Sequence, residues 1–392
     1  MNIGDFVHLN GDFKLTLGQS FKADMATGLD PLLGLAADAA INAAAGAFMP
    51  GLEVDSVFKY LLDVSDDYSV AHDVTFKGLT FGASNVNMFV GAGSPDFKKP
   101  FSEQGDLVGF GLQNLSVAIA NFRAYLPQFF GAQSVFSFSA HANEMGVYGM
   151  GDMLKILGKD ITVDVNSGGK ALGGLMRAMP VYSSIKNAGA PDGLKIATGG
   201  APVYLDLNGT EIVGLDVGLA EIAVADFLHL RGSLAFRKGE QYDVAVDLGG
   251  LAPLANQLGQ TLGTSLNPLP LRVEALTLGG SNLTGFAGVG GPYRYGPDLT
   301  GGKNKDTGAD IPDGLPDYIN DGAVGLAVDN VDFGLAIMQP ASFNMIPSLS
   351  AYTPKFISAK AYVGTAALVG VDEDILTVKA QDIEINVNTF YW

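Results

Sequence analysis

The sequence predicts a mainly β protein built from two tandem, diverged copies of one β-rich unit, with one helix in each copy. Three observations lead to this prediction. Apolar and polar residues alternate with period two in many segments, 52 of 392 residues are glycine, and five sequence blocks recur in the same order. Alternation is typical of strands with one buried face, and glycine without a collagen period indicates many tight turns.

Short alternating segments mark individual strands. ITVDVN at Ile161–Asn166, VYLDLNG at Val203–Gly209 and IEINVN at Ile383–Asn388 each place apolar and polar side chains on opposite faces. Two longer segments, Val108–Ala120 and Val324–Met338, also alternate and carry Asn or Asp-Asn near the middle. We therefore predict that each is a long strand with a bend or bulge at this point.

Five collinear blocks indicate an internal duplication. The paired blocks are Ile3–Phe13 with Val224–Leu234, Leu29–Ala36 with Leu251–Leu258, Leu79–Gly93 with Leu276–Gly290, Gly105–Phe122 with Asp321–Met338, and Ile161–Asn166 with Ile383–Asn388. We predict a first copy over residues 1–168, a connecting segment over 169–221 that includes the start of the next unit, and a second copy over 222–392.

The first copy is expected to be incomplete at its N-terminal side. The strand around Phe6–Leu17 has no preceding counterpart of Val203–Glu221, the segment that we expect to pair with the second copy. We therefore expect the chain to be a part of a longer array, with its open strand edge completed by a neighbouring unit or molecule.

One helix is predicted in each copy, at Pro31–Phe48 and at Pro253–Leu262. Pro31 suits the first turn of a helix, and Asp30 suits the N-cap. Two architectures fit this pattern: separate sandwich or barrel-like units, or an elongated, continuous sheet or solenoid-like rod. The strand-rich connecting segment favours a continuous structure.

Composition limits the environment and the partners of the chain. The net charge of −18 repels nucleic acid and anionic lipid, so neither is an expected partner. No cysteine is present, which excludes disulfides and thiolate chemistry. No secretion signal is visible, so either the chain is cytosolic or its export signal lies elsewhere in a longer parent. The apolar stretch Leu32–Phe48 is too short to span a bilayer, and we expect no membrane-spanning segment.

An acidic, glycine-rich loop is the best candidate for a metal site. Its carboxylates could supply hard oxygen ligands for Ca²⁺, although EF-hand spacing is absent and a solvated acidic loop is the alternative. The predicted calcium ligands are Asp306, Asp310, Asp313, Asp317 and Asp321. His8 and His229 occupy equivalent positions and are expected to share a packing or hydrogen-bonding role.

The repeated blocks resemble a repeat of very large bacterial secreted or surface proteins, which often also carry hemolysin-type calcium-binding or cadherin-like modules. The matching segments are Val224–Phe236, Leu276–Gly290, Asp306–Asp321, Val324–Met338 and Ala367–Asn388. The resemblance implies a role in adhesion or matrix at an extracellular location. The first copy departs from the pattern, because its loop Ser94–Gly105 is short and carries Lys98 and Lys99.

No sequence pattern indicates catalysis. GxSxG is absent, and the glycine-rich segment Gly288–Gly296 matches no nucleotide-binding motif and is interpreted as a turn at a strand end. We predict a structural or adhesive segment without enzymatic activity. Its expected partners are copies of itself, adjacent repeats or cell-surface glycans. One alternative is a module that binds carbohydrate or lipid in a concave β-surface, and a lesser one is an outer-membrane β-barrel, suggested by the aromatic C-terminal TFYW.

Overall fold

The computed structural model describes most of the chain. The described residues are 2–3, 6–28, 63–65, 69–126, 133–171, 176–247, 249–253, 256–257, 260, 267–296, 315–341, 354–372 and 374–391.

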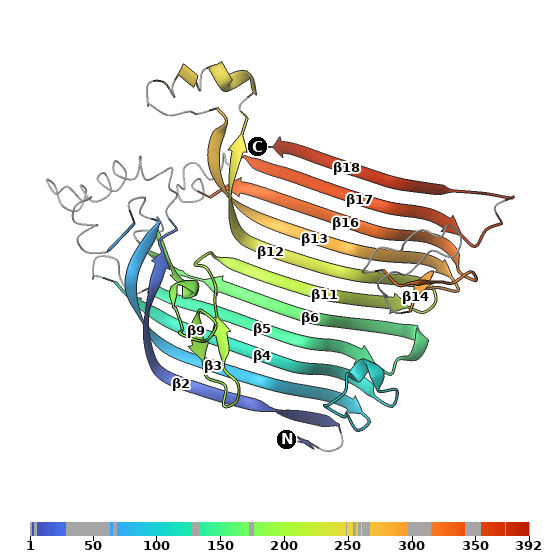
Figure 1. Cartoon of the computed structure of the whole chain (residues 1–392), viewed down its shortest axis with the longest axis horizontal. Helices are drawn as coiled ribbons and strands as arrows, with labels where there is room; N and C mark the ends of the chain where they lie inside the picture. Colours follow the sequence, from blue (N-terminus) through green and yellow to red (C-terminus); the bar gives the residue numbers. More distant parts are fainter. Residues whose placement is uncertain are drawn as a thin grey trace.

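One large antiparallel sheet of 14 strands dominates the described chain (Figure 1). Its strands lie in the order β18-β17-β16-β13-β12-β11-β6-β5-β4-β3-β2-β8-β7, and the short β1 pairs with β2. The bounds are β1 Asn2–Ile3, β2 Val7–Ala26, β3 Val70–Ala92, β4 Val108–Tyr125, β5 Gln133–Tyr148, β6 Leu154–Ser167, β7 Gly169–Ala171, β8 Met176–Val181, β11 Ile212–Val224, β12 Leu228–Val246, β13 Leu269–Val289, β16 Val324–Pro340, β17 Lys355–Val369 and β18 Lys379–Tyr391.

Two small hairpins lie outside the main sheet. They pair β9 (Leu194–Ile196) with β10 (Val203–Leu205), and β14 (Arg294–Tyr295) with β15 (Tyr318–Ile319). The prediction of a mainly β protein is therefore confirmed, and of the two expected architectures the described strands form the continuous sheet. This sheet is open, since β18 and β7 at the two ends of the strand order do not pair with each other.

The long strands bend along one line that crosses the sheet. On this line Asn114 in β4 and Asn330 in β16 adopt left-handed backbone conformations, with φ of 50° and 52°. The neighbouring ladders shift register at the same level. Asn adopts this conformation at a lower cost than most residues that carry a side chain. We predicted a bend or bulge near the middle of both long strands, and the register shifts confirm an irregularity of this kind there.

Two sets of five strands correspond in order and in backbone detail. The first strand set is β2, β3, β4, β5 and β6, and the second strand set is β12, β13, β16, β17 and β18. Left-handed residues recur at matching positions: Asn85 and Asn282, Asn114 and Asn330, and Asp160 and Asp382. Strand β11 lies between the sets and pairs with both β6 and β12, so one sheet runs through both.

The largest hydrophobic core of the described chain lies on one face of the first strand set. Phe76 from β3 and Phe122 from β4 are buried there against Tyr182, Ile196 and Leu205. The last three residues belong to the connecting segment, whose short strand β9 lies across the first strand set in Figure 1. This segment therefore covers the sheet as well as linking the two strand sets.

The described chain has essentially no helices, so the prediction of one helix in each copy is not confirmed there. Helical structure there is confined to short 3-10 helices, such as Phe101–Glu103 and Tyr182–Ser184, and to a few residues between 252 and 260. Pro31–Phe48 lies outside the described residues, and Pro253–Leu262 is described only in part. Among the described residues, short strands and the 3-10 helix Tyr182–Ser184 of the connecting segment cover the apolar face of the first strand set. No described helix is long and apolar enough to cross a membrane.

Candidate functional site

The outer edge of β18 is the first candidate site, because it is the end strand of the main sheet (Figure 1). β18 pairs with β17 along one edge, and no described strand pairs along the other. Ile385 is 52% exposed and Val387 is 44% exposed. A long strand with an open edge presents backbone N–H and C=O groups that can bind a further strand.

An apolar row of side chains crosses the sheet and reaches this edge. Residues that pair directly in antiparallel strands point to the same face, so the paired positions can be followed from strand to strand. The row consists of Phe13, Ala83, Val117, Ala140, Val163, Leu215, Phe236, Leu278, Leu335, Ala359 and Val387. An added strand would therefore find an apolar neighbour in Val387.

The edge of β2 at the opposite side of the main sheet is more occupied. β1 pairs with Val7 and His8 at one end of β2, and β8 pairs with Asp24 to Ala26 at the other. Between these two segments, Gly199 lies close to the backbone of β2. A Cβ atom added to Gly199 would lie 3.3 Å from the carbonyl oxygen of Phe13. Neighbouring segments thus lie close to parts of the β2 edge. By contrast, every residue of β18 except Ile383 is exposed, so β18 is the less covered of the two strands.

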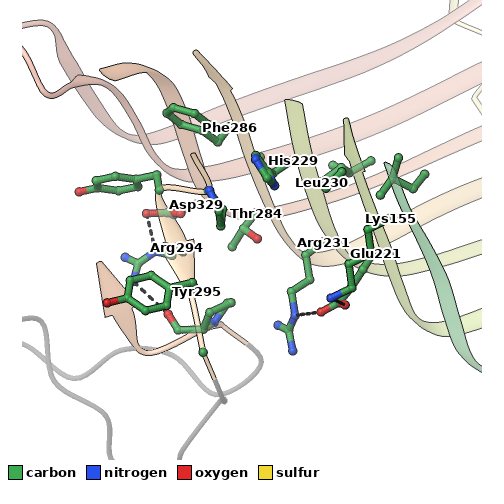
Figure 2. Close-up of a pocket in the computed structure, with 17 residues that line it drawn as sticks. Lys155, Glu221, His229, Leu230, Arg231, Thr284, Phe286, Arg294, Tyr295 and Asp329 are labelled. Carbon is green, nitrogen blue, oxygen red and sulfur yellow. Dashed lines mark hydrogen bonds and ion pairs between the residues drawn. The ribbon is translucent and has the colours of Figure 1, made fainter. Parts of the chain in front are cut away.

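A cavity of about 360 Å³ is the second candidate site (Figure 2). It lies between the sheet, with residues of β6, β11, β12, β13 and β16, and the segment that contains β14. Phe286 and His229 contribute ring surfaces, Tyr293 and Tyr295 come from the β14 segment, and Thr284 contributes a hydroxyl group. Such a mixture of rings and polar groups suits a small polar ligand.

Ion pairs hold one wall of this cavity. Glu221 lies 2.5 Å from the Lys155 ammonium and 3.0 Å from the Arg231 guanidinium (Figure 2). Burial alone would raise the pKa of Glu221, but the hydrogen bonds and charges of Lys155 and Arg231 hold that pKa below its ordinary value. Glu221 is therefore an ionised carboxylate that ties β6, β11 and β12 together.

A second and more deeply buried ion pair joins the β14 segment to the sheet. Arg294 Nε lies 2.7 Å from Asp329 Oδ2, and only 10% and 9% of the two side chains are exposed. Burial raises the pKa of Asp329, and the Arg294 guanidinium opposes this shift. The close pairing with a guanidinium indicates that the carboxylate is charged at neutral pH, so each partner compensates the other.

The two repeated histidines occupy matching places in the sheet. His8 pairs with Phe89 across β2 and β3, and His229 pairs with Phe286 across β12 and β13. In both, the Nε2 atom is buried and has no hydrogen-bond partner among the described residues. Burial lowers the pKa of His229, so its ring packs in the neutral form.

In the first strand set, aromatic side chains pack around Phe89, the counterpart of Phe286, at the place where the second set has the cavity. Phe101 is fully buried there, with its ring centroid 5.6 Å from that of Phe89 and 5.8 Å from that of Tyr148. Its backbone N–H donates to Gln113 Oε1 at 2.9 Å. Gln113 matches Asp329 in position, so the same place carries a neutral amide in one set and an ion pair in the other.

The predicted calcium loop falls only partly within the described residues. Asp306, Asp310 and Asp313 lie outside them, whereas Asp317 and Asp321 flank β15. In the described part of the chain, no three His, Asp or Glu side chains gather as a metal site requires. The calcium site stays a prediction.

Sequence reasoning missed the cavity. Gly288–Gly296, interpreted as a strand-end turn, contributes Arg294 and Tyr295 to it. Two differences in the sequence could have pointed to it. Arg231 lies two residues after the repeated His229, and Asp329 stands where the first copy has Gln113. Comparisons with protein families, curated proteins and solved structures found nothing similar to this chain.

Replacing Glu221 with glutamine should lower the free energy of unfolding at neutral pH by about 2 kcal/mol, because hydrogen bonds to charged groups contribute on that order. The folded pKa of Glu221 is lowered, so its stabilisation is present above the unfolded pKa of about 4.3 and is lost as the pH falls through the folded value. Urea unfolding at several pH values should show the difference shrinking below about pH 4.

Glu384→Gln is the matched control for this experiment. Glu384 also pairs with a lysine, Lys360, at 3.0 Å, but both side chains are exposed. Exposed pairs of this kind contribute little to stability. Equal losses in the two variants at neutral pH would contradict the role given to burial at Glu221.

Proposed function

We propose that this chain is a structural, adhesive segment of an extracellular bacterial repeat protein, and that it joins other copies or adjacent repeats by extending its sheet. It acts without catalysis. The observation that carries the proposal is the open, exposed edge of β18 at the end of a sheet that already runs through two matching strand sets.

The edge of β18 lacks two of the features by which proteins prevent strand addition, short length and proline. It is 13 residues long and contains no proline. Natural edge strands are usually short, interrupted by proline, or covered by another segment. The apolar row that ends at Val387 adds side-chain contacts to the backbone hydrogen bonds that a new strand would make. A strand with these properties favours extension of the sheet.

Association should depend on this edge. Analytical ultracentrifugation over a range of concentrations should show the unmodified chain forming dimers at physiological ionic strength, where repulsion between chains of net charge −18 is screened. Ile385→Lys should remain monomeric, because a lysine on an edge strand opposes strand addition. Val289→Lys is the control, since Val289 is 72% exposed but lies on the internal strand β13.

Two outcomes would contradict the proposal. One is an unmodified chain that stays monomeric at every concentration. The other is an Ile385→Lys chain that associates as well as the unmodified one, since association would then use another surface. Circular dichroism should show the same β content in all three chains, because both substituted side chains are exposed.

The cavity beside β14 favours a second candidate function, the binding of a small polar ligand such as a carbohydrate. Arg231 and Arg294 line it together with three aromatic side chains, Phe286, Tyr293 and Tyr295. Ile385 is not among the lining residues, so the Ile385→Lys chain separates the two functions. Ligand binding retained by a chain that no longer associates would show that the cavity acts independently of the edge.

A further inference from the structure

We infer that the open edge of β18 is a binding site for an antiparallel strand of the β11 type, carried by a further repeat of the same kind. The inference rests on the proposed function and deepens it, because it names the partner strand and its register. It is drawn from the internal counterpart of β18, which has such a strand in place.

That internal counterpart is β6. Leu154–Asn166 reads LKILGKDITVDVN and Leu376–Asn388 reads LTVKAQDIEINVN, so the two segments match without a gap. Asp160 and Asp382 occupy the same position and share a left-handed φ of 51°. The two strands therefore share a left-handed residue at the same place, and their outer edges present backbone groups in the same arrangement.

The edge of β6 that matches the open edge of β18 is occupied by β11. The ladder runs antiparallel from Ile212 opposite Asn166 to Val224 opposite Leu154. It therefore covers Leu157–Asn166 of β6, the part that matches Lys379–Asn388 of β18. The same backbone geometry in β18 predicts the same ladder with a second strand of this type.

Transferring this register to β18 gives three apolar pairs. Val213, Leu215 and Val217 of β11 lie opposite Val165, Val163 and Ile161 of β6. The matching residues of β18 are Val387, Ile385 and Ile383. Positions equivalent to these three in the added strand would therefore meet apolar side chains, and cross-strand apolar pairs stabilise a sheet.

The charged positions specify the partner further. Glu221 lies opposite Leu157 of β6, whose counterpart in β18 is Lys379, so a glutamate there would gain an opposite charge. Asp216 lies opposite Thr162, whose counterpart is Glu384, so an aspartate there would meet a like charge. The strand that binds β18 is therefore expected to resemble β11 but to carry a neutral or basic residue in place of Asp216.

The first strand set provides independent support. β1 pairs Asn2 with His8 and Ile3 with Val7. At the matching place in the second set, the end of β11 pairs Ala223 with His229 and Val224 with Leu228. A strand in the β11 position is thus present beside both β2 and β12, in the same register, which indicates that this position is a regular part of the repeat.

Thiol cross-linking tests the register, because the chain contains no cysteine. A Val387→Cys chain is mixed, in a glutathione redox buffer, with a synthetic peptide of residues 212–224 that carries Asp216→Lys. A peptide with Val213→Cys should form the mixed disulfide, since directly paired residues have Cα atoms within disulfide reach. A peptide with Gly214→Cys should not, because successive side chains of a strand point to opposite faces.

Two controls accompany this experiment. A Val289→Cys chain, with its cysteine on the internal strand β13, should not cross-link to either peptide. The peptide with native Asp216 should bind more weakly than the peptide with lysine at this position. Failure of the Val213→Cys peptide to cross-link, or equal cross-linking by both peptides, would overturn the inference. If the Val213→Cys peptide failed to cross-link but self-association of the chain still required Ile385, the proposed function would stand, and a strand of another type would bind β18. Cross-linking in register by a chain that stays monomeric would instead support the inference and contradict self-association.

Discussion

Replacement of Phe76 by alanine is expected to lower the free energy of unfolding by about 3–5 kcal/mol, the usual cost of removing a buried phenylalanine side chain. Phe76 is fully buried, and its ring stacks on that of Phe21 with centroids 5.3 Å apart. Beneath the connecting segment it belongs to the same cluster as Tyr182 and Ile196. Denaturant unfolding followed by circular dichroism measures the loss.

Phe136→Ala is the matched control for Phe76→Ala. Phe136 lies on β5 of the same strand set but is 41% exposed. Its replacement should cost less than about 1 kcal/mol, because the ring is already partly in water. Similar losses for the two variants would show that the connecting segment does not form the cover of this sheet.

Replacement of Arg294 by methionine is expected to lower the free energy of unfolding by about 3–5 kcal/mol, because it leaves a buried charge without its partner. The charge is that of Asp329, which is only 9% exposed and whose pKa burial already raises. Methionine keeps most of the side-chain volume of arginine, so the loss reports the charge rather than a cavity.

The double variant Arg294→Met with Asp329→Leu provides the control. Replacing a buried ion pair by apolar residues of similar volume is often neutral or stabilising, so most of the lost stability should return. Denaturant unfolding of the single and double variants gives both values. A double variant that is less stable than Arg294→Met would show that the pair holds the β14 segment through its charges.

The β class and the bends of the long strands could be predicted because both depend on local chemistry. Alternation of apolar and polar residues, as in Ile161–Asn166, suits a strand wherever it occurs. Asn114 and Asn330 mark bulges because asparagine adopts the left-handed conformation at low cost. Both features follow from a few neighbouring residues and need no knowledge of distant ones.

The cavity could not be predicted in the same way. The ion pair of Arg294 with Asp329 forms between residues far apart in the sequence. It depends on how the β14 segment folds back over the sheet, which no local pattern encodes.

The sequence by itself determined that the chain forms long, bent strands in two corresponding sets, because alternation, bulge residues and repeated blocks are properties of short segments. Only the tertiary structure decided that β11 joins the sets into one sheet and that β18 pairs with a single neighbour, β17, among the described strands. The physical reason is that every strand offers the same backbone N–H and C=O groups. Which strands pair therefore depends on register and on the path of the chain.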